Sequence, residues 1–212
     1  YNDLIEKQIS KGNLCVINML NAKYVISNGE AIQNPDALGN AWFVDSLIYA
    51  DGANAEMEAL DSLDAGRAAV VDKPFQGILK ATAAKQPGDT IFETTYAPNR
   101  LTYHSQSAGN RVAVFSEIYF PWGWTATIDG KPAEIARVDY VLRALPVPAG
   151  KHTIEFRFEP QSQVTGERIS IASIIIVYML IAGSIALAVV RYLRRKKGGK
   201  PEDNAPKADE LA

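Results

Sequence analysis

An uncharged apolar run at residues 169–190 constrains this chain more than any other feature. Its 22 residues, ISIASIIIVYMLIAGSIALAVV, contain no Asp, Glu, Lys, Arg or His. At about 1.5 Å of rise per residue the run makes a helix of roughly 33 Å, and the hydrocarbon core of a bilayer is roughly 30 Å thick. The sequence therefore predicts one transmembrane helix over residues 169–190.

Basic residues are distributed unequally around this predicted helix. Two stand in the 15 residues before it, Arg157 and Arg168, whereas six follow it closely: Arg191, Arg194, Arg195, Lys196, Lys197 and Lys200. Because cytoplasmic flanks carry the excess of Lys and Arg, we expect the C-terminus in the cytoplasm and residues 1–168 outside it. The alternative is a tail-anchored protein with a cytoplasmic domain. It would place the basic cluster outside the cytoplasm, contrary to the usual excess of Lys and Arg on cytoplasmic flanks.

Export of residues 1–168 requires a signal ahead of them. Residues 1–30 show no charged segment followed by an apolar run, and the first residue is Tyr1 rather than Met. We therefore expect this chain to be the C-terminal piece of a longer protein that carries earlier membrane segments.

Charge and cysteine usage exclude several classes of protein. Residues 1–168 carry 15 basic and 20 acidic residues, which disfavours nucleic-acid binding because no basic stripe is present. Cys15 is the single cysteine, so neither an internal disulfide nor a cysteine metal site is expected. Residues 191–212 carry 7 basic and 4 acidic residues and are predicted to form a disordered cytoplasmic tail that meets anionic lipid headgroups.

Residues 1–80 show the pattern of a small α/β unit. A helix is predicted over residues 4–20 with a break near Gly12, and a second helix is predicted to start at an Asn54 cap. Apolar segments at residues 22–26, 42–49 and 68–71 predict strands, so strand, helix, strand is the expected core of this unit.

From residue 89 the apolar pattern changes to a period of two. About seven strands are predicted within residues 89–160, with turn signals every 8 to 12 residues, as in an antiparallel β-sandwich. Asp129-Gly130 between two such runs is a strong hairpin signal, with residues 131–138 as the returning strand. Residues 161–167 are expected to be a short polar link. The predicted fold class is an α+β ectodomain, a small α/β unit plus an antiparallel β-sandwich, followed by one transmembrane helix.

Residues 114–166 contain a series of spaced elements: Tyr119, Pro121 and Trp124, then Asp129-Gly130-Lys131, Leu142-Arg143, Pro148 to His152, and Phe156 with Pro160. On these elements the segment resembles the C-terminal extracytoplasmic domain of the bacterial YfhO membrane-protein family. Residues 19–26 and 39–44 are similar to the region that precedes this domain in the family.

The resemblance implies a large multi-pass protein of the bacterial cytoplasmic (inner) membrane. Family members are similar to glycosyltransferases that use polyprenyl-phosphate sugars, and their catalytic acidic residue lies in an early extracytoplasmic loop. No catalytic residue is therefore assigned to this chain, and no cofactor is expected. Partners implied are the lipid bilayer, the other membrane helices of the missing part, and an envelope polysaccharide or lipid-linked sugar.

Trp122 and Trp124, which flank Gly123, are candidate substrate-binding residues because aromatic faces stack on sugar rings. The structural alternative is that one tryptophan fills the sandwich core while the other covers its edge or meets the membrane interface.

Arg143, inside an apolar strand, is the third candidate, for a phosphate or sugar ligand. The alternative is a structural ion pair with Asp139, Glu134 or Glu117. The two histidines, His104 and His152, lie on separate predicted strands and predict no metal site. Glu93, Glu117 and Glu155 stand on strands where a carboxylate pair could form, but their spacing does not require one.

Two functions are consistent with these observations. The first is an accessory or acceptor-recognition part of a YfhO-type, glycosyltransferase-like membrane protein. The alternative is a non-enzymatic, membrane-anchored β-sandwich that binds a carbohydrate or a protein.

Overall fold

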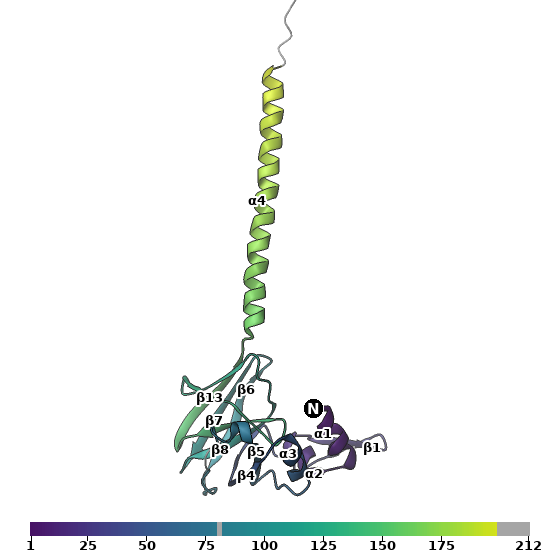
Figure 1. Cartoon of the computed structure of the whole chain (residues 1–212), viewed down its shortest axis with the longest axis vertical. Helices are drawn as coiled ribbons and strands as arrows, with labels where there is room; N and C mark the ends of the chain where they lie inside the picture. The colour runs from purple at the N-terminus through teal and green to yellow at the C-terminus, as the bar shows by residue number, and fades with distance from the viewer. Residues whose placement is uncertain (80–81, 199–212) are drawn as a thin grey trace, which may run out of the picture. The chain divides into compact units, whose positions relative to one another are not determined.

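The computed structural model describes residues 1–79 and 82–198, and it consists of two compact units, Tyr1–Pro160 and Gln161–Ala212 (Figure 1). The first unit is rich in β-structure, and the second is a single long helix over its described part. Most of the predicted disordered tail, residues 199–212, lies outside the described residues.

The helices of the first unit are short. They are α1 (Asn2–Lys7), the 3₁₀ helix η1 (Ile9–Lys11), α2 (Leu14–Met19), α3 (Ala53–Ala59) and the 3₁₀ helix η2 (Lys73–Phe75). The predicted break falls at Gly12, whose φ of 72° is left-handed and ends η1. The Asn13 side chain then caps α2 by accepting from the Cys15 N–H. The cap predicted at Asn54 is wrong, because α3 starts one residue earlier and Gly52 occupies its N-cap.

Thirteen strands are assigned among the described residues. They are β1 (Tyr24–Ser27), β2 (Glu30–Gln33), β3 (Ala41–Val44), β4 (Ser46–Ala50), β5 (Ala68–Asp72), β6 (Thr90–Ala97), β7 (Arg100–Ser107), β8 (Arg111–Ile118), β9 (Trp124–Ile128), β10 (Lys131–Ala133), β11 (Ala136–Val138), β12 (Leu142–Val147) and β13 (Gly150–Phe158). Together with the short helices they confirm the predicted α+β class.

Two large sheets and one hairpin contain these strands. The five-stranded sheet has the order β10-β9-β13-β7-β6 and is antiparallel throughout. The six-stranded sheet has the order β3-β8-β12-β11-β5-β4, and only its β4–β5 pair is parallel. α3 lies between β4 and β5 in the chain, so the expected strand, helix, strand unit is present. β1 and β2 form a separate hairpin.

The central strands of the six-stranded sheet are buried on both faces, and β8 shows why. Phe115 and Ala113 point into a core between the two large sheets, with Tyr103 and Phe156 from the five-stranded sheet. The alternate residues Val112 and Val114 point the other way, into a second core with side chains of the short helices. A strand buried on both faces is apolar without alternation, which accounts for the continuous apolar run predicted there.

Two predicted strands are divided in the structure. The segment 42–49 becomes β3 and β4, which lie at opposite edges of the six-stranded sheet. The returning strand predicted at 131–138 becomes β10, which pairs with β9, and β11, which crosses to the other sheet and pairs with β12. Pro132 lies on β10 at the sheet edge, where a residue without an N–H is tolerated.

The division into residues 1–80 and 89–160 stays a prediction about folding units. In the structure, β3, β4 and β5 from the first stretch share a hydrogen-bonded sheet with β8, β11 and β12 from the second. The two stretches therefore contribute to one compact unit, Tyr1–Pro160.

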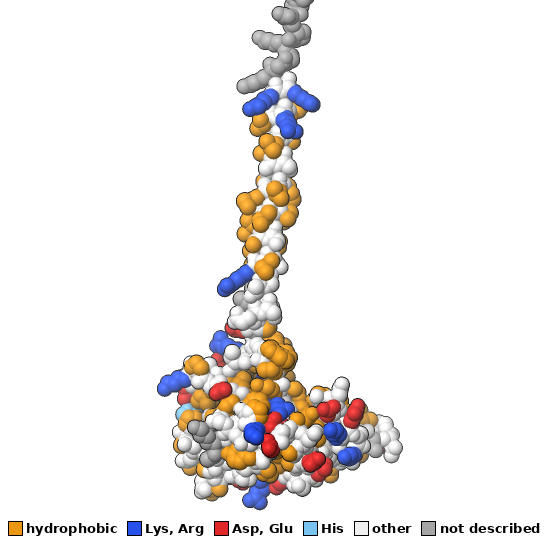
Figure 2. All heavy atoms as spheres, in the orientation of Figure 1, with side chains coloured by type: hydrophobic (Ala, Val, Ile, Leu, Met, Phe, Trp, Pro, Cys, Tyr) orange, Lys and Arg blue, Asp and Glu red, His pale blue; other side chains and the backbone are white. Residues whose placement is uncertain are grey.

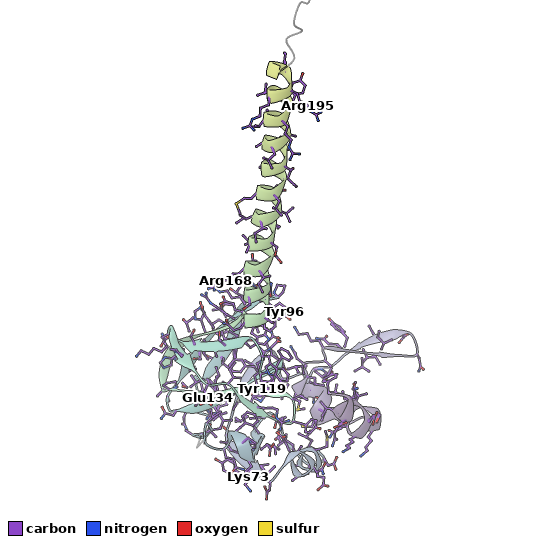
Figure 3. All side chains as sticks on the ribbon, turned by 45° about the horizontal axis from the view of Figure 1, so that its top comes forward. Lys73, Tyr96, Tyr119, Glu134, Arg168 and Arg195 are labelled. Carbon is purple, nitrogen blue, oxygen red and sulfur yellow. The ribbon has the colours of Figure 1, made fainter. Side chains whose placement is uncertain are left out.

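The second unit contains α4 (Gln161–Gly198). Residues 161–167 are helical, not an irregular link, so α4 begins eight residues before the apolar run. Within Gln161–Lys196 an 18-residue window has a mean hydropathy of 2.6, and α4 is the one described helix long and apolar enough to cross a membrane. Figure 2 shows its hydrophobic side chains between two basic ends, and Figure 3 labels Arg168 and Arg195 at those ends.

Candidate functional site

The loop between β8 and β9, residues 119–123, is held at both ends by backbone hydrogen bonds. The Tyr119 N–H donates to the Val141 carbonyl at 2.7 Å, and the Gly123 carbonyl accepts from the Glu159 N–H at 2.8 Å. Gly123 has a φ of 115°, and a Cβ there would lie 2.9 Å from the Phe158 ring. The loop therefore needs glycine at this position, both for its backbone conformation and for its close approach to Phe158.

Trp124 on β9 of the five-stranded sheet and Arg143 on β12 of the six-stranded sheet lie against each other. The guanidinium carbon of Arg143 is 4.1 Å from the centroid of the Trp124 ring, within cation–π distance, and 5.6 Å from that of Phe156. Arg143 is only 3% exposed, and its Nε donates to the Ile118 carbonyl at 3.0 Å. The stack orients Trp124 and holds a buried positive charge directly behind it.

Polar side chains surround this buried arginine on the inner side. Burial raises the pKa of Glu117, with the Arg143 charge opposing that rise and the Glu93 charge adding to it. Burial and the charges of Glu93 and Glu117 also raise the pKa of Tyr103. Three buried atoms have no hydrogen-bond partner here: Arg143 Nη1, Tyr103 Oη and Glu93 Oε1. No ion pair joins Arg143 to a carboxylate among the described residues, so its charge is balanced at longer range by Glu117.

A groove of about 350 Å³ opens beside Trp124. Its wall is made by the β8–β9 loop, the start of β9 and the crossing between β10 and β11, and its residues include Tyr119, Phe120, Pro121, Trp124, Thr125 and Glu134. Tyr119 and Glu134 are labelled in Figure 3. Apolar faces next to a phenol, a hydroxyl and a carboxylate suit a ring that has a flat C–H face and hydroxyl groups at its edge.

The structure separates the three candidate residues into two groups. Trp124 and Arg143 are brought together, although the sequence places them 19 positions apart. Trp122 is not among the residues that line the groove; it is 71% exposed and packs edge-to-face on Phe120 at 5.2 Å between ring centroids. A ligand role for any of the three stays a prediction.

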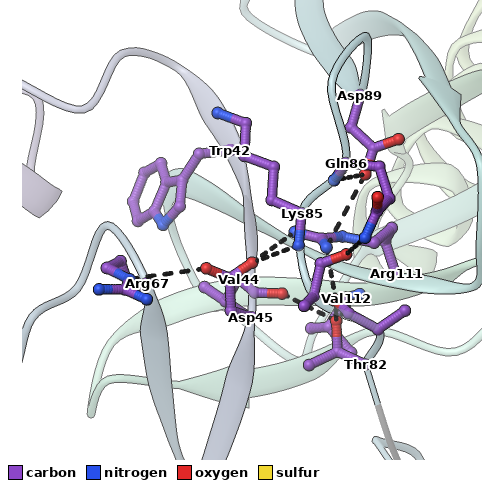
Figure 4. Close-up of polar contacts among 12 residues, drawn as sticks. Trp42, Val44, Asp45, Arg67, Thr82, Lys85, Gln86, Asp89, Arg111 and Val112 are labelled. Atoms are coloured by element: carbon purple, nitrogen blue, oxygen red, sulfur yellow. Dashed lines mark hydrogen bonds and ion pairs between the residues drawn. The ribbon is translucent and has the colours of Figure 1, made fainter.

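A second buried arginine was not singled out in the sequence. The Arg111 side chain is completely buried, and its Nη atoms lie 3.1 Å from Asp45 and 3.8 Å from Asp89 (Figure 4). Asp89 also accepts from the Gln86 and Ala108 N–H groups. Asp45 lies between β3 and β4, Asp89 precedes β6, and Arg111 is on β8. Because these residues are far apart in the sequence, no local pattern could reveal the network. Its hydrogen bonds join loops to strands, so we assign it a structural role.

The two histidines do not share a metal site. His152 Nδ1 is 2.6 Å from the Asp129 carboxylate and its Nε2 is 3.1 Å from the Ala149 carbonyl, so both ring nitrogens face acceptors. The hydrogen bond to Asp129 raises the pKa of His152. Asp129 and Gly130 have φ values of 52° and 77°, as the predicted tight hairpin requires. Within the described part of the chain, no group of three His, Cys, Asp or Glu side chains is arranged for a metal ion.

A β-rich unit followed by one described helix of membrane-spanning length and composition is typical of a membrane protein. The family comparison narrows this class. Residues 68–170 match the model of the family described as "Bacterial membrane protein YfhO". The match runs from β5 to the start of α4, so it includes the whole five-stranded sheet and the groove.

The resemblance to the YfhO family is thus confirmed over residues 68–170, just under half of the 212 residues. Residues 1–67, which form β1 to β4 and α1 to α3, lie outside the match. No curated protein and no solved structure was found to match the chain.

Proposed function

We propose that this chain supplies the C-terminal extracytoplasmic domain and last membrane helix of a multi-pass, glycosyltransferase-like protein of the YfhO type. Its contribution is recognition of a carbohydrate acceptor rather than the chemical step. The observation that carries this proposal is the groove beside Trp124, in which an indole ring backed by the Arg143 guanidinium at 4.1 Å adjoins Tyr119, Thr125 and Glu134.

The shape and chemistry of the groove support a sugar ligand. The half-buried Trp124 indole lines the groove, and the Arg143 guanidinium at 4.1 Å and the Phe158 ring at 5.2 Å from its centroid hold its orientation, so little side-chain entropy is lost on binding. Glu134 is exposed and can accept hydrogen bonds from sugar hydroxyls. Glu93 and Glu117 do not line the groove, so the carboxylates at its surface do not form the facing pair that glycoside hydrolysis uses.

The proposed orientation, with residues 1–168 outside the cytoplasmic membrane, is supported by the flanks of α4. Arg191, Arg194, Arg195 and Lys196 crowd its C-terminal end, whereas Arg168 is the only basic residue of α4 ahead of the apolar run. The apolar window of α4 is unburied over its whole length, and small residues recur four apart, as at Ala182 and Ala186. Such a surface suits packing against further membrane helices of a multi-pass parent.

The test is sugar transfer by the full-length parent protein in membranes, with Trp124→Leu compared against wild type. Loss of the stacking surface, about 1 to 1.5 kcal/mol, should raise the KM for the acceptor about tenfold while kcat changes little. His152→Gln, at a residue that does not line the groove, is the control and should behave as wild type. An unchanged acceptor KM in a folded Trp124→Leu protein would remove the acceptor role.

A non-enzymatic carbohydrate-binding module is the second candidate, since the groove is complete within this chain. It predicts that the purified chain in lipid nanodiscs binds glycans on an array in the absence of any donor. Glycan binding that Trp124→Leu abolishes, combined with unchanged transfer by the parent, would favour this module over the acceptor role.

A further inference from the structure

An exposed aromatic patch stands at the tip of the β8–β9 loop. It consists of Phe120, Pro121 and Trp122, and Phe120 and Trp122 are 44% and 71% exposed. Their rings pack edge-to-face at 5.2 Å, and Phe120 rests on Phe158 with the ring centroids 6.3 Å apart. Large aromatic side chains gathered on a surface mark an interaction site rather than part of a core.

The patch is fixed to the segment of chain that leads into α4. Phe158 is the last residue of β13, and the Glu159 N–H donates to the Gly123 carbonyl, which follows Trp122 directly. Gly123 approaches Pro160 so closely that an added Cβ would lie 3.0 Å from its side chain. The position of the patch is therefore tied to Phe158–Pro160 and not to a free loop.

Chain length limits how far this patch can be from a bilayer. Residues 161–168 are helical and separate Pro160 from the uncharged run that starts at Ile169. Eight helical residues cover about 12 Å, and the polar layer of a bilayer is about 5 to 8 Å thick on each side. Tilting of α4, commonly about 20°, shortens this height by less than about 1 Å. Pro160 therefore lies only about 4 to 7 Å beyond the polar layer, whatever the angle between the two units.

We infer that the Phe120–Pro121–Trp122 patch inserts into the headgroup layer of the bilayer that α4 crosses. Trp is enriched at this depth because its ring is apolar and its N–H can still reach water or lipid oxygen atoms. Two contacts, α4 and the patch, then hold the β-rich unit against the membrane surface. This inference does not depend on the carbohydrate role of the groove or on which side of the membrane the unit lies.

Bromolipid quenching of tryptophan fluorescence tests this inference in the full chain. The chain is reconstituted in phosphatidylcholine–phosphatidylglycerol liposomes with bromine atoms on the upper acyl chain, and wild type is compared with Trp122→Phe. The variant keeps an aromatic ring in the patch and leaves Trp42 and Trp124 as internal controls. We expect quenching of the wild-type emission and loss of that quenched component in the variant.

Equal fractional quenching of wild type and Trp122→Phe would overturn the inference. A second measurement identifies a different occupant of the patch. Quenching of Trp122 fluorescence by iodide, which stays in the water, is measured at decreasing ratios of protein to lipid. If Trp122 is protected only at high protein-to-lipid ratios, a second copy of the chain covers the patch and the inferred membrane contact is wrong. Protection that is independent of dilution supports contact with lipid.

Discussion

At the scale of single residues, Arg143 combines burial with charge. It lies inside the sandwich on β12, and burial lowers its pKa, yet Trp124 and the Ile118 carbonyl hold it there. Its positive charge is the main influence that opposes the burial-induced rise in the pKa of Glu117. Substitution of Arg143 should therefore lower the free energy of unfolding in two ways, by removing packing contacts and by leaving the Glu117 charge without its counter-charge.

Arg143→Met is expected to lower the free energy of unfolding by about 2 to 4 kcal/mol at pH 7.5, because packing of a buried side chain is lost and the half-buried Glu117 carboxylate loses its balancing charge. The folded-state pKa of Glu117 is raised above its unfolded value, so its penalty is absent below about pH 4.5 and grows as pH rises through the folded pKa. The loss should accordingly shrink near pH 4.5. Urea unfolding of the full chain in detergent, followed by near-UV circular dichroism, measures both values.

The double variant Arg143→Met/Glu117→Gln is the control for this prediction. It should recover part of the loss at pH 7.5 and show little of the extra pH dependence, since the half-buried carboxylate that lacked a counter-charge is then gone. Identical losses in the single and double variants at every pH would show that Glu117 and Arg143 are not coupled.

Gly123 gives a second prediction at this scale. Gly123→Ala places a Cβ 2.9 Å from the Phe158 ring and 3.1 Å from the Pro160 backbone, in addition to the left-handed strain at φ 115°. We expect a loss of about 2 to 4 kcal/mol in the free energy of unfolding. Gly130→Ala, with φ 77° but no atom within 4 Å, isolates the strain alone and should cost about 1 kcal/mol. Thermal unfolding of the two variants in detergent compares them directly, and equal losses would refute the steric contribution.

At the scale of elements, β3 shows how a strand from the N-terminal stretch completes the sandwich. Phe43 enters the core between the two large sheets, beside Phe115 of β8, whereas Trp42 enters the opposite core and donates to the Ala65 carbonyl at 2.7 Å. β3 thus joins both cores. This role follows from the register Phe43 with Ala113, which no local pattern contains.

Phe43→Ala is expected to destabilise the whole first unit by about 3 to 5 kcal/mol, because it empties space between the two sheets. Ile48→Ala on β4, at a site 44% exposed, should cost less than about 1 kcal/mol. Urea unfolding should show one shifted transition reported equally by near-UV and far-UV signals. Two separate transitions would instead favour independent folding of residues 1–80 and 89–160.

At the scale of the molecule, the arrangement of the chain across the membrane is the main prediction. Cys15 is half-buried and burial raises its pKa, so its thiol is a poor labelling site. In a Cys15→Ser background, Lys131→Cys at the exposed start of β10 should react with an impermeant maleimide in intact cells. Lys196→Cys at the far end of α4 should react only after permeabilisation. The reverse pattern would invert the proposed topology and leave the bilayer contact of the aromatic patch untouched.

The sequence by itself determined the long apolar helix, the α+β fold class, the Asp129-Gly130 turn and the resemblance to the YfhO family over residues 68–170. These features are local: hydrophobicity adds along a single helix, strand alternation has a period of two, and a tight turn needs particular backbone angles at two adjacent residues.

Only the tertiary structure decided which strands share a sheet, that residues 131–138 cross between the sheets, and that Trp124 meets Arg143 while Trp122 stays exposed. These outcomes depend on pairing between residues far apart in the chain. A strand of given polarity can satisfy its hydrogen bonds beside many neighbours, and packing of both faces of the six-stranded sheet selects among them.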